Sequence, residues 1–462
     1  MNDGSRYEVV LRHLTHLVEA ATPGAPLPST RSLSRTLGAS PVTIGRAISA
    51  LASRGLVHTE PGRGTFVTRA TQTRSADVGW QPMALPPASV ALGSVEPLDP
   101  AHGDPGLVPL SSGYLGADLQ PRQALQAAAS RTVRRQEIWS PAPAAGLTEL
   151  RAVFAAQIGA DSDQVIVTQG SQSGLALALR ALGTPGDAIA VENPTYPGAL
   201  AAARAAGLRP VAVPMDRHGI RPDDLDRVLA RSQARLVYLQ TAVNNPAGVT
   251  LSPDRRQEIL AVAADHQVLL IDDDWARFLP LDRPVAPPLI ADDLGGHVVH
   301  LSSLAKPVAP SLRIGFLAAT GPALVRLRTA TITDALFVAR PMQEIALELL
   351  TSPQWPQHLK RMRRVLVARR DHLLAEVART WPSPDPSTTR PTAGYHLWVR
   401  CPDSLTSGEV TQRARAAGIV VLDGALAFAD EPPTQHVRMS FGAINEVAAT
   451  AALQTLAAAL RS

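Results

Sequence analysis

The sequence of 462 residues contains one cysteine, Cys401. A single cysteine cannot form a disulfide framework within the chain or a cysteine-based zinc site, so we expect no metal centre. The chain also lacks a run of about 18 uncharged apolar residues, which argues against a membrane-spanning helix. Charges interrupt the first 20 residues, so a signal peptide is not expected. These absences favour a protein of the cytoplasm.

Lysine is nearly absent as well. Only Lys306 and Lys360 occur among 44 basic residues, and the others are arginine.

Positive charge is unevenly distributed along the chain. Residues 1–69 hold eight arginines and four acids, a net charge of +4, and the whole chain also has a net charge of +4. The rest of the chain therefore balances to zero. An excess of positive charge confined to the first part suits a polyanionic partner such as nucleic acid.

The composition is that of a folded globular protein, with 45% hydrophobic and 18% charged residues. A chain of 462 residues is too long for one compact core, so we expect two or three domains. Pattern and composition place a first domain over residues 1–69, a linker over 70–107 and a second domain over 108–462. The linker is rich in Pro, Ala, Ser and Gly. The alternative for it is an irregular arm packed on the second domain.

Residues 1–69 show the pattern of a winged helix-turn-helix. Apolar spacing predicts helices over residues 6–20, 29–37 and 41–53. Ser29 or Thr30 caps the second helix, and the Ser40-Pro41 pair is a strong start for the third. A short hairpin follows, in which the turn PGRG joins LVHTE to TFVTR. In such domains the second helix of the helix-turn-helix motif lies in the DNA major groove.

We therefore expect this domain to bind double-stranded DNA. The inward stripe of the third helix is formed by Ile44, Ala47, Ile48 and Leu51. Thr43 and Arg46 are then expected on the outer face. The predicted DNA contacts, placed to reach phosphates or base edges, are Arg31, Thr43, Arg46, Gly62 and Arg63. The alternative is a protein-interaction module whose arginines are merely solvated.

The segment LPSTRSLSRTLGASPVTIGRAISALASRGLVHTEPGRGTFV resembles the GntR family of bacterial regulators almost position for position. This resemblance implies that the domain binds an operator sequence. Two positions depart from the family pattern. Pro41 stands where the family often has a DNA-contacting arginine, and Gly45 stands at a position that can carry one. The operator sequence is therefore left open, whereas binding to DNA is expected.

From about residue 108, short apolar strands alternate with helices. The strand-like runs are QVIVTQG, AIAVENP, RLVYLQT, VLLIDDD and VVHLSS, and helical segments such as 172–182 and 252–266 lie between them. This alternation predicts an α/β domain with a mainly parallel sheet that is covered on both faces. Ligands of such sheets bind at the carboxyl ends of the strands, where the polar motifs of this sequence gather.

Three of these motifs offer an amine, an anion pocket and a carboxylate. The amine is Lys306, in SSLAKPVAPSLRIGF. A helix that opens after a strand offers backbone N–H groups to an anion at Gly170, Ser171 and Gln172. Three adjacent acids end an apolar strand and repel one another unless a cation faces them: Asp272, Asp273 and Asp274. Pyridoxal phosphate requires these groups, its pyridine nitrogen being the cation.

Further residues fit the same cofactor. Tyr196 in VENPTYPG is placed to stack on the ring, and Asn245 in NNPAG to donate a hydrogen bond to the ring oxygen. Ser303 and Arg313 flank Lys306 and would complete a phosphate cradle. Taken singly, each motif also has an ordinary structural explanation, such as turn chemistry or a solvated strand end. Their occurrence together in one consistent order favours the cofactor interpretation.

The ordered set GSQ, ENPTYPG, NPAG, DDDW, S-x-x-K and K-x6-R resembles the aminotransferase class I/II family, of fold type I, across about residues 108–460. This resemblance implies that Lys306 forms the Schiff base with pyridoxal phosphate. It also implies that Asp273 pairs with the pyridine nitrogen, with Asp272 as the alternative if the register is off by one. Arg438 in VRMSFG matches the arginine that grips the α-carboxylate of a substrate.

Two positions near the site depart from this second family. Trp275 stands where the family usually has a tyrosine that bonds the ring oxygen of the cofactor. An indole N–H can still donate to that oxygen but cannot accept a hydrogen bond. Pro307 directly follows the lysine and would stiffen its loop. How the Schiff base is tuned is therefore left open.

A GntR-type head on an aminotransferase-like body resembles the MocR subgroup of GntR regulators. This resemblance implies a head-to-tail homodimer whose body senses pyridoxal phosphate, or a small amino compound that reacts with it, and usually does not turn over. Two alternatives stay open. One is an active aminotransferase that carries a DNA-binding head, which Asn245 and Arg438 would suit. The other is a DNA-binding protein whose body has lost the cofactor, although Lys306 persists in a chain with two lysines.

Overall fold

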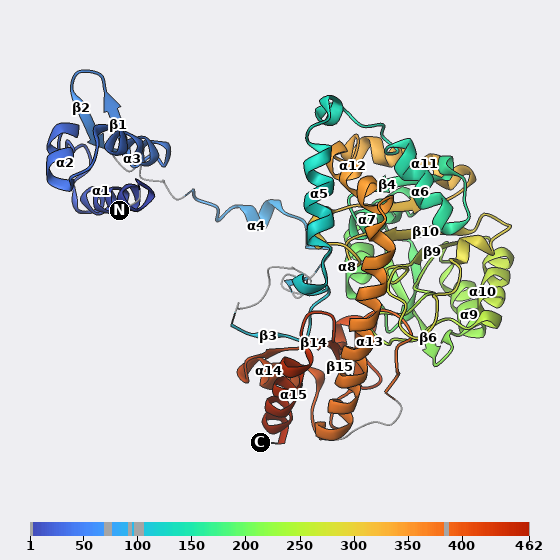
Figure 1. The fold of residues 1–462 in the computed structure, drawn as a ribbon. Helices are drawn as coiled ribbons and strands as arrows, with labels where there is room; N and C mark the ends of the chain where they lie inside the picture. The colour runs from blue at the N-terminus through green and yellow to red at the C-terminus, as the bar shows by residue number, and fades with distance from the viewer. Residues whose placement is uncertain (1–2, 69–75, 91–94, 97–105, 383–387, 462) are drawn as a thin grey trace. The chain divides into compact units, whose positions relative to one another are not determined.

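The computed structural model describes residues 3–68, 76–90, 95–96, 106–382 and 388–461. Contacts within the chain form two compact units, Met1–Pro87 and Ala88–Ser462. Each unit has a hydrophobic core of its own. Figure 1 shows the helices and strands of each unit. Much of the expected linker, residues 70–107, lies outside the described residues. Within it, α4 is a single helical turn over Gln81–Ala84.

The N-terminal unit contains the helices and the hairpin that the sequence predicts. Its elements are α1 Asp3–Ala20, α2 Thr30–Leu37, α3 Pro41–Ser53, β1 Val57–Glu60 and β2 Gly64–Val67. Ser29 caps α2 by accepting the N–H of Ser32, and Gly38 ends that helix with a φ of 59°. The strands β1 and β2 are antiparallel. The core of the unit includes Val10, Leu14, Leu33, Ile44, Ala47, Leu51, Val57 and Val67.

The first turn of α3 corrects one prediction. Ser40 Oγ accepts the N–H of Thr43 at 3.1 Å and lies 2.9 Å from Thr43 Oγ1. Thr43 is only 6% exposed, so the prediction that its side chain faces outward was wrong. The cap is the physical reason, because the third residue of a helix is the one that a capping serine binds. Its hydroxyl is turned toward Ser40 and away from the outer face.

The C-terminal unit contains an eight-stranded sheet in the order β4-β11-β10-β9-β8-β5-β6-β7. The strands are β4 Val165–Thr168, β5 Ala188–Asn193, β6 Arg209–Asp216, β7 Gly219–Ile220, β8 Leu236–Leu239, β9 Leu269–Asp273, β10 Val298–Ser303 and β11 Gly315–Ala318. The central strands from β10 to β6 run parallel, whereas β11 is antiparallel to both β10 and β4. The mainly parallel sheet and the five strands predicted for it are therefore confirmed.

Helices cover both faces of this sheet (Figure 1). They are α5 Arg122–Thr132, α6 Thr148–Ile158, α7 Ser171–Leu182, α8 Pro197–Ala205, α9 Pro222–Ser232, α10 Pro253–His266, α11 Gly321–Ala335 and α12 Arg340–Leu350. In β5, Ile189 and Val191 pack in the cluster of α7 and α8, whereas Ala188 and Ala190 pack in that of α9 and α10. Burial on both faces explains the continuous apolar runs. Among the described residues, no helix is both long and apolar enough to span a membrane.

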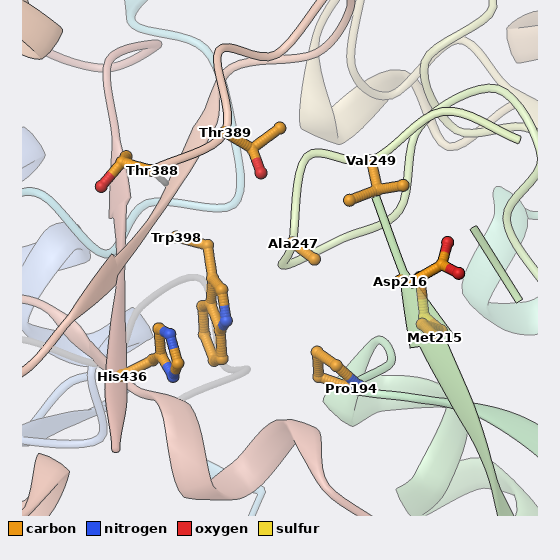
Figure 2. A pocket seen from close by; sticks show the side chains of 9 residues that line it. All are labelled: Pro194, Met215, Asp216, Ala247, Val249, Thr388, Thr389, Trp398 and His436. Carbon is orange, nitrogen blue, oxygen red and sulfur yellow. The ribbon is translucent and has the colours of Figure 1, made fainter. Parts of the chain in front are cut away.

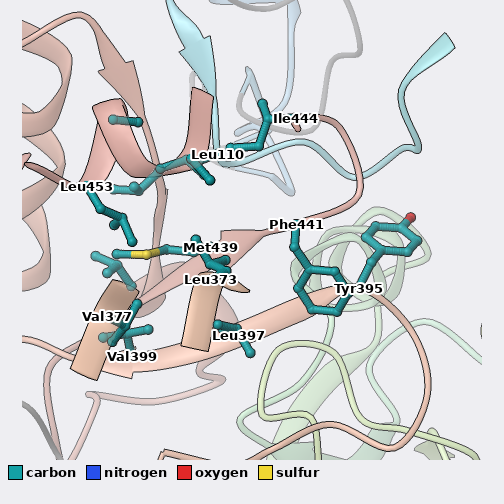
Figure 3. Close-up of a cluster of buried hydrophobic side chains, with 14 of the residues drawn as sticks. Leu110, Leu373, Val377, Tyr395, Leu397, Val399, Met439, Phe441, Ile444 and Leu453 are labelled. Carbon is teal, nitrogen blue, oxygen red and sulfur yellow. The ribbon is translucent and has the colours of Figure 1, made fainter. Parts of the chain in front are cut away.

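The last part of the chain forms a smaller layered subdomain (Figure 3). Its elements are α13 Gln354–Thr380, β12 His396–Arg400, α14 Ser407–Ala416, β13 Ile419–Val420, β14 Leu422–Asp423, β15 His436–Ser440 and α15 Glu446–Arg461. The strands β12, β15 and β14 form an antiparallel sheet. Figure 3 shows Leu373 and Val377 of α13 packed with Leu397 and Met439 of this sheet. The strand β13 pairs in parallel with β3 Val108–Pro109, so a segment from the first part of the C-terminal unit packs on this subdomain.

Candidate cofactor site and DNA-binding surface

The carboxyl ends of three neighbouring strands bring predicted site residues together. Asp273 ends β9, Ser303 ends β10, and Gln240 directly follows β8. The strand β9 pairs in parallel with both β8 and β10. Because the carboxyl ends of parallel strands meet at one edge of a sheet, these side chains share that edge. Lys306 follows three residues after Ser303 and completes the group.

Asp273 is buried, and its carboxylate is only half satisfied. Oδ2 accepts hydrogen bonds from the Tyr238 hydroxyl at 2.7 Å and from the Gln240 side chain at 3.3 Å. Oδ1 has no hydrogen-bond partner among the described residues. Burial raises the pKa of Asp273 to about 6, in spite of the hydrogen bond from Tyr238. A buried carboxylate with an unused oxygen is stabilised by a cation, and a protonated pyridine nitrogen fits this description.

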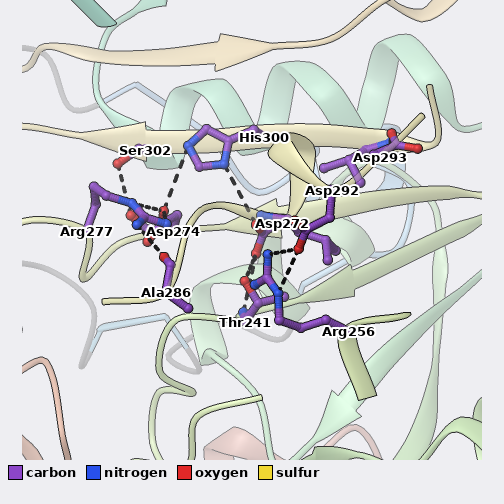
Figure 4. Close-up of polar contacts among 12 residues, drawn as sticks. Thr241, Arg256, Asp272, Asp274, Arg277, Ala286, Asp292, Asp293, His300 and Ser302 are labelled. Atoms are coloured by element: carbon purple, nitrogen blue, oxygen red, sulfur yellow. Dashed lines mark hydrogen bonds and ion pairs between the residues drawn. The ribbon is translucent and has the colours of Figure 1, made fainter. Parts of the chain in front are cut away.

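Asp272 and Asp274 have partners of their own, away from this carboxylate (Figure 4). Asp272 accepts the hydroxyl of Thr241 at 2.9 Å, and Asp274 forms an ion pair with Arg277. The ring of His300 lies between them, with Nδ1 3.7 Å from Asp272 and Nε2 4.0 Å from Asp274. Successive side chains of a strand alternate between its faces. The register therefore places only the middle acid at the site, and the alternative residue Asp272 belongs to a structural network.

Lys306 carries its amine at the same edge. Nζ donates to the carbonyl of Gly113 at 2.6 Å and lies 4.1 Å from the centroid of the Tyr114 ring. Burial lowers the pKa of Lys306 to about 7, and the positive charges of Arg438 and Arg313 act in the same direction. A large fraction of this amine is therefore neutral near pH 7. The neutral amine is the form that attacks an aldehyde carbon.

The turn between β4 and α7 forms an anion cradle with Arg313. Gly170 in this turn has a φ of 81°, and a Cβ there would lie 3.0 Å from the guanidinium carbon of Arg313. The α7 helix begins at Ser171, where the first N–H groups of a helix are available to an anion. The Oγ of Ser303 is buried and has no hydrogen-bond partner in the described part of the chain. Helix N–H groups, a hydroxyl and a guanidinium together suit a phosphate.

Tyr196 and Gln172 contact each other close to this turn. The Tyr196 hydroxyl donates to Gln172 Oε1 at 3.1 Å, and Gln172 Nε2 donates to the Gly198 carbonyl at 3.1 Å. A Cβ on Gly198 would lie 2.4 Å from the Tyr196 ring, so the ring packs directly on the helix backbone of α8. Tyr196 is thus held in one orientation, as a stacking platform requires. The sequence predicted Gln172 as part of the phosphate pocket. In the structure its side chain binds the Tyr196 hydroxyl.

Arg438 and Asn245 form a buried polar pair. Arg438 donates to Asn245 Oδ1 at 3.0 Å and to the carbonyl of Ser111 at 2.7 Å. The arginine is 5% exposed, and its Nε has no hydrogen-bond partner within the described ranges. The backbone N–H of Asn245 donates to Gln240 Oε1 at 2.9 Å, which links this pair to the partners of Asp273. A buried guanidinium without a carboxylate is unfavourable, so a ligand that brings one fits here.

Trp275 differs from its prediction. Its indole N–H donates to the carbonyl of Val243 at 2.8 Å and is therefore not available to a cofactor ring oxygen. The ring packs edge-on against Tyr395, with 5.4 Å between the centroids, and a Cβ on Gly394 would lie 2.6 Å from it. The carbonyl of Val243 thus occupies the single hydrogen-bond donor of the indole. The Tyr395 hydroxyl donates to the carbonyl of Gly113, the same oxygen that accepts from Lys306.

Several residues of the site have no counterpart in the sequence prediction. They are Tyr114, Tyr238, Gln240, His300 and Tyr395. Tyr238 and Gln240 belong to the run RLVYLQT. They could have been predicted only if the pairing of this strand with the acidic strand β9 had been known. Tyr114 and Tyr395 come from distant parts of the chain. No local pattern signals that they meet at Gly113.

A separate cavity of about 380 Å³ lies between residues of the large sheet and of the C-terminal subdomain. Figure 2 shows Trp398 and His436 on one wall and Met215 and Asp216 on the opposite one. The two rings are stacked with centroids 4.8 Å apart. Asp216 already pairs with Arg255 at 2.7 Å. None of the predicted cofactor-binding residues lines this cavity, so it is distinct from the site around Lys306.

On the N-terminal unit, the predicted DNA contacts other than Thr43 are exposed. They are Arg31 in α2, Arg46 in α3, and Gly62 and Arg63 in the β1–β2 turn. The guanidinium of Arg46 lies over the ring of Tyr7, 5.1 Å from its centroid. Arg63 forms an ion pair with Glu60. Both side chains are therefore held at the surface, and Arg63 would exchange its carboxylate for a phosphate on binding DNA.

Comparison with known proteins separates the chain into the same two parts. Residues 6–67 match the family of bacterial regulatory proteins named gntR, and residues 106–456 match aminotransferase class I and II. The uncharacterized HTH-type transcriptional regulator YdcR of Escherichia coli is 30% identical, with 87% of each chain covered. The HTH-type transcriptional regulator TauR of Rhodobacter capsulatus is 26% identical, and the match covers 95% of this chain and 93% of TauR.

The body also matches solved structures of aminotransferases. LysN, the alpha-aminoadipate aminotransferase of Thermus thermophilus in complex with N-(5'-phosphopyridoxyl)-L-leucine, has a TM-score of 0.73 and 27% identity. That match covers 79% of this chain and 96% of LysN. The buried Oδ1 of Asp273, the unpaired Oγ of Ser303 and the Gly170–Arg313 cradle fit pyridoxal phosphate as the cofactor of this fold. The chain belongs to the aminotransferase class I and II family and carries a gntR-family head, the combination found in MocR regulators.

Proposed function

We propose that the protein is a transcription regulator that binds double-stranded operator DNA through its winged helix. Its aminotransferase-like body senses pyridoxal phosphate, or a small amino compound that reacts with it. The observation that carries this proposal is the convergence of Lys306, the unpaired oxygen of Asp273 and the Gly170–Arg313 cradle at one sheet edge, in a chain with a DNA-binding head. We further propose a head-to-tail homodimer that acts in the cytoplasm.

The side chains around the sheet edge would hold the cofactor at its functional groups. Lys306 would bind the aldehyde carbon, Asp273 would face the pyridine nitrogen, and Tyr196 would stack on the ring. Ser303 and Arg313 would bind the phosphate, together with the N–H groups that begin α7. The cofactor supplies an electron-withdrawing ring to any amino compound attached to it. The protein supplies orientation and charge.

Arg438 and Asn245 would select the effector. The unpaired Nε of Arg438 offers one N–H to an incoming carboxylate, and Asn245 Oδ1 would give up its hydrogen bond from Arg438 to make room. The amide nitrogen of Asn245 can then serve the ring oxygen of the cofactor. An amino acid, which has a carboxylate next to its amine, matches the order of these groups along the site. We therefore propose an amino acid or a related amino compound as the effector.

Loss of Lys306 should abolish covalent binding of the cofactor. Purified wild-type protein supplied with pyridoxal phosphate should show a visible absorption band, and Lys306→Ala should show none. Lys360→Ala is the matched control, because it removes the only other lysine, which is exposed on α13. Absence of the band in the wild type, or its presence in Lys306→Ala, would overturn the assignment of the cofactor site.

Binding to DNA can be measured on the DNA upstream of the protein's own gene. We expect specific binding that changes when pyridoxal phosphate is added, and that weakens in Arg46→Ala. Each lost phosphate contact should lower the slope of log affinity against log salt by about 1. Arg235→Ala, which removes an arginine of the body, should leave the slope unchanged. If no duplex is bound at any salt concentration, the head is an interaction module instead.

An active aminotransferase is the second candidate function. The buried pair of Arg438 and Asn245 is compatible with it, because a carboxylate-binding arginine would serve the substrate of an enzyme as well as the effector of a sensor. Incubation with an amino acid and a 2-oxo acid distinguishes the two functions. An enzyme would convert many equivalents per site, whereas a sensor would stop after binding at most one.

A further inference from the structure

The start of α3 presents an apolar surface to solvent. Val42 is 72% exposed, and Pro41 before it is exposed too. Neither contributes to the core of the head, which takes Ile44 and Ala47 from the same helix. A single exposed valine is common on protein surfaces. This one lies at the N-terminal end of the recognition helix, whose first residues contact base edges in helix-turn-helix complexes.

Gly45 lies on the same face, one turn further along. Residues three and four apart are neighbours on a helix, so Val42, Gly45 and Arg46 form one strip. A Cβ on Gly45 would meet nothing within 4 Å. Packing inside the head therefore gives no reason for a glycine, which destabilises the interior of a helix relative to alanine. Because Gly45 has no side chain, the strip has a gap between Val42 and Arg46, called the notch below.

The polar groups of this first turn are already used within the head. The hydroxyl of Ser40 caps the helix and lies against that of Thr43, which is buried. The strip thus offers a base the methyl groups of Val42, the open notch of Gly45 and the charge of Arg46. In the major groove, the methyl group on C5 of thymine is the feature that apolar side chains contact.

We infer that Val42 and Gly45 of α3 bind a thymine methyl group in the major groove of the operator, with Arg46 on a neighbouring phosphate. This inference rests on the proposed binding of the head to operator DNA. The γ-methyl groups of Val42 make the contact, and the notch at Gly45 lets the base edge approach the helix closely. Val42 is then a specificity-determining residue at a position where an arginine would select guanine instead.

Replacement of thymine by deoxyuridine removes only the methyl group and so tests this contact. The full-length protein with its cofactor is first used to select a duplex from a random-sequence pool. Each thymine of that duplex is then replaced in turn. We expect a position in the half-site where uracil weakens binding about fourfold, the effect of burying one methyl group. In Val42→Ser the same replacement should have no effect.

Val9→Ser is the matched control, because Val9 lies on α1 and is 57% exposed. It should keep the wild-type sensitivity to uracil. Gly45→Ala should weaken binding of the selected duplex while the melting temperature of the head stays the same or rises. Uniform insensitivity of the wild type to uracil, or equal sensitivity in Val42→Ser and Val9→Ser, would overturn the inference and leave operator binding intact. Failure to select any duplex would overturn the proposed function itself.

Discussion

Three adjacent aspartates at the end of β9 have different surroundings, although the sequence shows them as a uniform run. Asp272 and Asp274 share the ring of His300, and Asp274 also pairs with Arg277. Oδ1 of Asp273 and Oδ1 of Asp274 both lack a hydrogen-bond partner among the described residues, but Asp274 is balanced by Arg277, whereas the described partners of Asp273, Tyr238 and Gln240, are neutral. Strand alternation and the ion pair of Asp274 thus favour Asp273 as the proposed partner of the ring nitrogen of the cofactor.

Asp273→Asn should weaken cofactor binding and reduce its acid sensitivity. A hydrogen bond between charged partners contributes about 1.5–3 kcal/mol, so affinity should fall by roughly 10- to 100-fold. In the wild type the pKa of Asp273 is raised to about 6 in the absence of a cation. The cofactor favours the ionised carboxylate, so its affinity should be full above that pKa and decline as the pH falls through it. The measurement is a cofactor titration at a series of pH values.

The variant should lose the part of this decline that belongs to Asp273, because an amide does not titrate, and should keep the part that follows the amine of Lys306 around its pKa of about 7. Asp265→Asn, at an exposed residue near the end of α10, serves as the control and should keep the wild-type pH profile. An Asp273→Asn profile identical to that of the wild type would mean that the acid sensitivity belongs to another group. The ring nitrogen would then have a different partner.

At this scale the sequence predicted those residues whose role follows from a local motif. Asp273 ends a strand, and Lys306 and Gly170 each follow one, so their place at the sheet edge could be inferred. Thr43 and Trp275 were misjudged because a nearer partner takes their polar groups, Ser40 in one case and the carbonyl of Val243 in the other. Which partner a polar group binds depends on the three-dimensional positions of nearby groups, and the spacing of residues in the sequence does not give these positions.

At the scale of elements, the backbone conformation of the turn from β4 into α7 determines the shape of the proposed phosphate cradle. Gly170 has a φ of 81° and a ψ of 171°, a region that only glycine occupies readily. A Cβ on the same residue would lie only 3.0 Å from the guanidinium carbon of Arg313. The position of the cradle therefore depends on one missing side chain as much as on the charged one.

Gly170→Ala should impair cofactor binding beyond its effect on stability. The added Cβ would push Arg313 from the cradle, so affinity for pyridoxal phosphate should fall by at least tenfold. Gly159→Ala is the control, because Gly159 ends α6 with a φ of 70° and a Cβ there meets nothing within 4 Å. It should destabilise the body by about 1–2 kcal/mol and leave cofactor affinity unchanged. Equal loss of affinity in both variants would show that the turn acts only through stability.

Most of the helices and strands could be predicted from the sequence. Which of them lie side by side in the fold could not. Caps and periodicity located α2, α3, α7 and α10, and apolar runs located five of the strands. The antiparallel strand β11, inserted between β4 and β10, has no local signature that reveals its place. For the same reason the hydrogen bond from Tyr395 to the carbonyl of Gly113 could not be foreseen, since the two residues lie far apart in the sequence.

At the scale of the whole molecule, the chain combines two units with separate cores. We expect two transitions on thermal unfolding. Pyridoxal phosphate at about 100 times its Kd should stabilise the body by roughly 2.7 kcal/mol and raise only the transition of the body. Calorimetry of the full-length protein measures both, and Lys306→Ala should lose most of the shift. An equal shift of the head transition would show that the two units unfold as one.

The scarcity of lysine has a practical consequence. The side-chain amines of the chain number two, a Lys306 with a pKa of about 7 and an exposed Lys360. An acylating reagent used near neutral pH would modify Lys306 only while its amine is unoccupied, and Lys360 would serve as an internal reference in the same molecule. The ratio of the two modified peptides in a mass spectrum would then report how much of the regulator carries its cofactor, even in an unfractionated cell extract.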